Sequence, residues 1–173
     1  MIFGVSTETY TLIHVVISLV GIISGFIVLF GLLAGKRLDG LTAVFLVTTV
    51  LTSVTGFGFP FDHLLPSHKV AILSLVALAI AIVARYPLHL AGVWRKTYVI
   101  SACVALYFNC FVLVVQFFEK ISALKAVAPT QKEAPFAVAQ LALLAIFAVL
   151  TIFAAKRFRD QPALLVRAAG RAG

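Results

Sequence analysis

The segment YTLIHVVISLVGIISGFIVLFGLLA, residues 10–34, holds one strongly polar side chain, His14, and no charged one. About 20 apolar helical residues cross a bilayer, because a helix rises about 1.5 Å per residue and the hydrocarbon core is about 30 Å thick. Four later segments are also apolar and nearly free of charge. The sequence therefore predicts an all-α polytopic membrane protein, a bundle of five transmembrane helices spanning residues 10–34, 41–59, 68–85, 97–118 and 135–155.

The composition agrees with a membrane protein. Of the 173 residues, 62% are hydrophobic and 12% are charged, whereas a soluble domain carries about 25% charged residues. We expect one five-helix transmembrane domain, residues 1–155, and a basic cytoplasmic tail, residues 156–173. Residues 1–9 contain no Lys or Arg, so they lack the basic region of a cleaved signal peptide, and we expect the first span to be retained.

The basic residues predict the orientation of the chain. Ten lie in the 1–2 connection, the 3–4 connection and the tail, and four lie on the other side of the membrane. Cytoplasmic loops carry the excess of Lys and Arg. We therefore expect the N-terminus outside, the C-terminus in the cytoplasm, and a location in the bacterial inner membrane.

The net charge of +8 has the same explanation. Because the basic residues lie at the ends of apolar segments, the charge indicates topology and no nucleic-acid partner. The partners that we expect are the lipid bilayer itself and anionic lipid at the basic tail. The small-residue steps Gly21–Gly25 and Gly31–Gly35 would let a second copy of the chain, or another membrane subunit, approach the first span closely.

Several polar residues fall in the outer half of the predicted bundle. Intramembrane polar side chains are costly and are candidates for function, although they also form hydrogen bonds that hold helices together. Both interpretations apply to the ligand-binding candidates, which are His14, His68, Thr52, Asn109, Gln116 and Gln140.

Three kinds of site are compatible with these residues. A b-type haem would take His14 and His68 as axial ligands, with Lys69 near a propionate. A quinone or lipid pocket would use His14, Thr52, Gln116 and Gln140 around an apolar groove. A metal site is the weakest candidate, because its residues lie in or next to one connection without a one-face spacing; they are Asp62, His63 and His68.

No signature of a hydrolase or of a phosphoryl-transfer enzyme is present. GFGFP, residues 56–60, lacks the Lys that follows a phosphate-binding loop. The six acidic residues lie in predicted loops or termini, which argues against a proton relay. Cys103 and Cys110 are seven residues apart on one helix, about 10 Å along its axis, and so cannot form a disulfide with each other.

The connection at residues 119–134 contains a helix-start signal. Thr130 and Glu133 have the spacing of a capping box, and Pro135 follows, so we expect the last helix to start near these residues.

The whole chain resembles uncharacterised small multi-pass inner-membrane proteins of Gram-negative bacteria. The resemblance rests on IHVVISLVG (13–21), GLLAGKRLDG (31–40), TGFGFPF (55–61), LLPSHK (64–69) and APTQKEAPF (128–136). It implies an inner-membrane location and no established activity. A looser similarity to cytochrome b bundles rests on His14 and His68 alone and lacks a second histidine pair.

These observations favour a non-enzymatic accessory or small-ligand-binding membrane subunit, with quinone or lipid as its ligand and a polar cluster in its outer half. The alternative is an electron-transfer protein with one haem b on His14 and His68. A further alternative is a small transporter or channel subunit.

Overall fold

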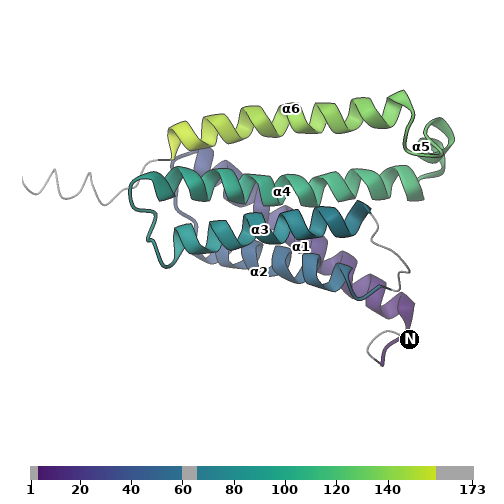
Figure 1. Ribbon diagram of the computed structural model, residues 1–173, viewed down its shortest axis with the longest axis horizontal. Helices are drawn as coiled ribbons and strands as arrows, with labels where there is room; N and C mark the ends of the chain where they lie inside the picture. Colours follow the sequence, from purple (N-terminus) through teal and green to yellow (C-terminus); the bar gives the residue numbers. More distant parts are fainter. Residues whose placement is uncertain (1–3, 60–65, 159–173) are drawn as a thin grey trace, which may run out of the picture.

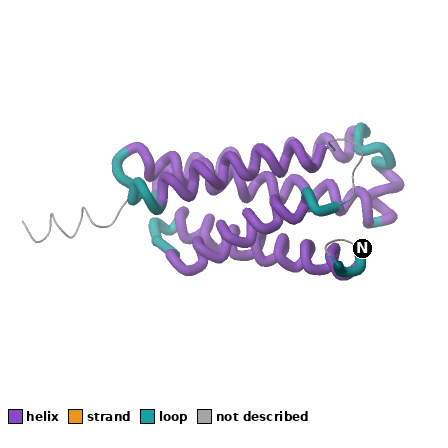
Figure 2. The backbone as a smooth tube through the Cα atoms, turned by 60° about the horizontal axis from the view of Figure 1, so that its bottom comes forward, coloured by secondary structure: helices purple, strands orange, loops and turns teal. Residues whose placement is uncertain are grey.

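The computed structural model describes residues 4–59 and 66–158, and this part of the chain is an all-α bundle (Figure 1). Its helices are α1 (Thr7–Leu33), α2 (Asp39–Gly56), α3 (Pro66–Arg85), α4 (Val93–Lys120), α5 (Ser122–Val127) and α6 (Ala134–Arg157). All except α5 are long and apolar enough to cross a membrane, which confirms the five predicted spans. Figure 2 shows that the five long helices run along one direction and that the connections gather at the two ends.

The ends of α1 follow from local sequence. Ser6 caps the start, because its hydroxyl accepts a hydrogen bond from the backbone N–H of Thr9 at 3.1 Å. At the other end, Gly35 has φ +69°, and the N–H of Lys36 donates to the carbonyl of Gly31 at 2.8 Å. This is a Schellman C-cap, which glycine forms without a Cβ penalty. The chain can therefore turn directly into α2.

The predicted capping box is displaced from the start of α6. Thr130 does not cap the helix; Glu133 is the N-cap residue, and Pro135 lies in the first turn. The Glu133 carboxylate accepts hydrogen bonds from the hydroxyl of Thr130 at 2.8 Å and from its N–H at 3.2 Å. These bonds hold the pKa of Glu133 below its usual value. The hydrogen bonds between Thr130 and Glu133 thus order the connection that precedes α6.

The central helix of the bundle is α4, which packs against α1, α2, α3 and α6. Its contact with α3 is extensive, and both helices carry buried alanines: Ala77, Ala81, Ala84, Ala102 and Ala105. Small residues let two helix backbones approach in lipid, where dispersion contacts supply the attraction. In contrast, α6 lies at the edge of the bundle in Figure 1, against α4 and α1.

The glycines of α1 face the inside of the bundle. A Cβ on Gly25 would lie 2.6 Å from Leu106 Cδ1 of α4 and 2.9 Å from the ring of Phe45 of α2. A Cβ on Gly21 would lie 3.2 Å from the hydroxyl of Thr48. The small-residue face is therefore occupied by helices of the same chain. This close approach serves the fold of the single chain, and packing of a second copy against the chain stays a prediction.

Gly25→Ala should lower the free energy of unfolding by about 1–3 kcal/mol, since the new methyl group overpacks the contact among α1, α2 and α4. Gly40→Ala is the matched control, because a Cβ on Gly40 meets no atom within 4 Å. Thermal unfolding in mild detergent measures both variants. Equal stability of the two variants would contradict the tight contact at Gly25.

Candidate functional site

His14 lies at the contact between the first half of α1 and the end of α2. Its Nδ1 is 2.8 Å from the hydroxyl oxygen of Thr55, and its ring meets the edge of the Phe59 ring at a centroid distance of 5.3 Å. One turn earlier, the Tyr10 hydroxyl donates to the carbonyl of Thr55 at 2.7 Å. His14 therefore joins two helices through a hydrogen bond, which is the structural role weighed above against haem ligation.

His68 lies in the first turn of α3 and is buried, with 3% of its surface exposed. Its ring stacks on Phe57 at a centroid distance of 5.2 Å and an interplanar angle of 18°. Phe57 follows the last residue of α2. Thr55, the partner of His14, lies in the last turn of the same helix. Both histidines thus contact the last residues of α2, from two different helices and at the same end of the bundle.

Asn109 and Thr52 lie deeper, and the structure gives them different roles. The buried Asn109 amide donates to the Thr49 hydroxyl at 3.3 Å and so links α4 to α2 beside Gly21. The hydroxyl of Thr52 donates to the carbonyl of Thr48 in its own helix at 2.9 Å. Such bonds satisfy polar groups without water. Asn109 connects two helices, whereas Thr52 connects none through this bond.

Gln116 and Gln140 do not join the two histidines. Gln116 is exposed, and its amide lies 3.4 Å from a carboxylate oxygen of Glu119. Gln140 of α6 is buried and donates to the carbonyl of Phe111 of α4 at 3.2 Å. The predicted outer residues therefore serve separate contacts: α1 with α2, α2 with α4, and α4 with α6.

Only one of the three metal-site candidates, His68, lies in the described part of the chain. Asp62 and His63 lie outside the described residues. Within residues 4–59 and 66–158, no three side chains of His, Cys, Asp or Glu gather as a metal site would require. Cys103 and Cys110 are both buried free thiols, as their spacing predicts.

An ion pair that the sequence did not reveal closes the opposite end of the bundle. Arg85 ends α3, yet its side chain is only 2% exposed. Its guanidinium donates to the carboxylate of Asp39 at the start of α2 and lies 5.0 Å above the ring of Tyr98. In the sequence, Arg85 is one of the ten basic residues that predict the orientation, and no partner is predicted for it. The order of the helices could have indicated this pair, because the start of one span and the end of the next lie at the same end of a bundle.

Asp39→Asn should lower the free energy of unfolding by about 1–3 kcal/mol, because it leaves the buried Arg85 guanidinium without its carboxylate. Arg37→Gln should lower the free energy of unfolding by less than about 1 kcal/mol, since the Arg37–Asp39 pair is exposed to solvent. Unfolding by denaturant in mixed micelles compares the two. A larger loss for Arg37→Gln would contradict the greater contribution of the Arg85–Asp39 pair.

An apolar groove lies between α4 and α6. Its volume is about 460 Å³. The α4 wall is formed by Lys96, Ile100, Cys103, Val104 and Tyr107, and the α6 wall by Leu144, Phe147, Ala148, Thr151, Ile152, Ala155 and Lys156. The Tyr107 and Phe147 rings meet edge to face at 5.7 Å, in the part of the groove away from the two lysines. This groove was not predicted from the sequence, in which Lys96 and Lys156 indicate only the orientation of the chain.

A second hollow, of about 380 Å³, lies at the other end of the bundle, in the connection between α4 and α6. It is lined by Phe118, Glu119, Lys125, Pro129, Thr130 and Gln131. Gln131 has φ +58° and donates to the carbonyl of Val115 at 3.3 Å, which holds the connection against α4. This hollow belongs to a polar surface loop and offers no apolar wall comparable to that of the groove.

No protein-family model, no curated protein and no solved structure matches this chain. The length and hydropathy of its helices identify the chain as a multi-pass membrane protein.

Proposed function

We propose that this protein is a non-enzymatic, ligand-binding subunit of the bacterial inner membrane whose ligand is a lipid or another molecule with a long apolar tail, such as a quinone. The observation that carries the proposal is the groove between α4 and α6. Ligand sites are typically concave and largely apolar, with a few polar groups that orient the ligand. Here Thr151 and Tyr107 are such groups, and the lysines mark one end.

The proposal moves the ligand site away from the outer polar residues. His14, Asn109 and Gln140 hydrogen-bond to neighbouring helices, so we assign to them the interhelical role. The charge distribution supports the predicted orientation. Among the described residues, the end of the bundle where α1, α3 and α6 end carries a single carboxylate, Asp39, and many basic side chains: Lys36, Arg37, Arg85, Arg95, Lys96, Lys156 and Arg157. We call this end the basic end and propose that it faces the cytoplasm.

Ala148→Trp should abolish retention of a lipid-like ligand, because the indole would fill the groove from its α6 wall. Ala145→Trp is the matched control: Ala145 is also exposed on α6 but does not line the groove. Native mass spectrometry of protein released from mild detergent measures the bound mass. Unchanged retention in Ala148→Trp would remove the groove as the site.

Haem b remains the alternative, favoured by the position of His14 and His68 on two helices at the same end of α2. A haem protein would give a sharp low-spin band pair in a reduced-minus-oxidised spectrum, and His14→Ala would abolish it. On our assignment the spectrum is flat, and His14→Ala lowers stability by about 0.5–1.5 kcal/mol through loss of the bond to Thr55. A band pair in the wild-type protein would overturn that assignment.

A further inference from the structure

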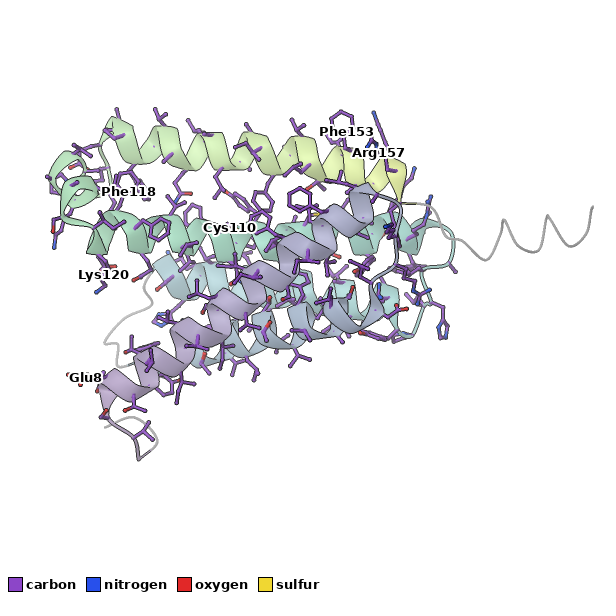
Figure 3. The ribbon with its side chains drawn as sticks, turned by 180° about the vertical axis from the view of Figure 1, so that it is seen from behind. Glu8, Cys110, Phe118, Lys120, Phe153 and Arg157 are labelled. Carbon is purple, nitrogen blue, oxygen red and sulfur yellow. The ribbon has the colours of Figure 1, made fainter. Side chains whose placement is uncertain are left out.

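The groove between α4 and α6 is charged at one end only. Because the two helices are antiparallel, Lys96 near the start of α4 and Lys156 near the end of α6 lie at the same end of the groove. In Figure 3, the Arg157 label marks this end, and the Lys120 and Phe118 labels mark the opposite end of the bundle. The other groove walls carry no charge. The site is therefore amphipathic along its length.

The length of the groove corresponds to one leaflet of a bilayer. On α4 it runs from Lys96 to Tyr107, which is about 16 Å at about 1.5 Å per helical residue. Half of the hydrocarbon core is about 15 Å. A molecule whose charged group lies at the lysines would thus extend its tail to the middle of the membrane. This is the shape of one acyl chain of a membrane lipid.

The charges at the groove's mouth are available to an anion. Lys96 and Lys156 are both exposed, and within the described ranges neither has a carboxylate at ion-pair distance. Asp39, the carboxylate of the basic end, pairs with Arg37 and Arg85 instead. Among the described residues, the opposite end of the bundle carries four lysines and three carboxylates: Lys69, Lys120, Lys125 and Lys132, with Glu8, Glu119 and Glu133. An anionic group would therefore be drawn to the mouth of this groove.

We propose that the groove binds an anionic phospholipid, with its phosphate between Lys96 and Lys156 and one acyl chain along the apolar walls toward Tyr107 and Phe147. The inference rests on the proposed function and specifies its ligand class. Lys side chains are point donors well suited to phosphate, and each basic residue near a surface adds to the attraction of anionic lipid. Binding is non-covalent, and the protein recognises charge at the mouth and chain shape in the groove.

The test uses the full chain in micelles that contain phosphatidylglycerol and phosphatidylcholine with identical acyl chains, followed by native mass spectrometry of the retained lipid. The wild type should retain phosphatidylglycerol in preference. The double variant K96Q/K156Q should lower that preference by about 10- to 30-fold, since two charges are lost. The control K36Q/R157Q removes two charges from the same end without touching the groove walls, and should keep the preference.

The outcomes separate this inference from the proposed function. If Ala148→Trp abolishes retention but the wild type does not discriminate, or K96Q/K156Q does not change the preference, the anionic headgroup is wrong and the groove remains the site. If K36Q/R157Q loses the preference equally, the basic end attracts anionic lipid without a specific site, and the inference fails. Both proposals fail if Ala148→Trp retains as much lipid as the wild type, or if the mass spectrum shows a dimer of the chain without lipid. A thermal melt of each variant establishes that it is folded.

Discussion

The close approach of small residues around α4 is the constraint on which the bundle depends. In a bilayer, lipid tails are as apolar as the helix surfaces, so burial of hydrophobic area gives little reason for helices to associate. Helices must instead come near enough for many dispersion contacts and for short hydrogen bonds. The alanines of α3 and α4 and the glycines of α1 make that approach geometrically available.

Hydrogen bonds between helices follow from this packing. The amide of Asn109 reaches the hydroxyl of Thr49 where Gly21 leaves room beside both side chains. The hydroxyls of Thr48 and Thr52 donate hydrogen bonds to carbonyls of their own helix, so they present no unsatisfied donor to lipid. His14, Asn109 and Gln140 each hydrogen-bond to a neighbouring helix, and together they link three different pairs of helices. Packing is looser at the groove between α4 and α6, because α6 is the least buried of the five long helices and leaves apolar side chains uncovered there.

Much of the fold was predictable from the sequence, because runs of apolar residues and bilayer thickness determine where spans lie. The boundaries of α3 and α6 were predicted within two residues, whereas α5 was not, since six residues without periodicity resemble a loop. The candidate site was predictable only in part. Asn109 and His14 are polar residues in apolar runs and attract notice, but whether such residues converge depends on helix rotation, which composition does not encode. Arg85 and the lysines of the groove were read as topology signals, although the structure gives the former a buried partner and places the latter at a pocket.

The peripheral position of α6 also bears on how the molecule is made. Helices α1 to α4 contain the contacts that define the bundle, and they precede α6 in the chain by the connection that holds α5. During synthesis these four helices can associate before α6 leaves the ribosome, since domains and their parts assemble from the N-terminus onward. One wall of the groove arrives only with α6. An occupied groove would then mark a chain whose insertion is complete, and lipid captured there would act as the last component of the fold.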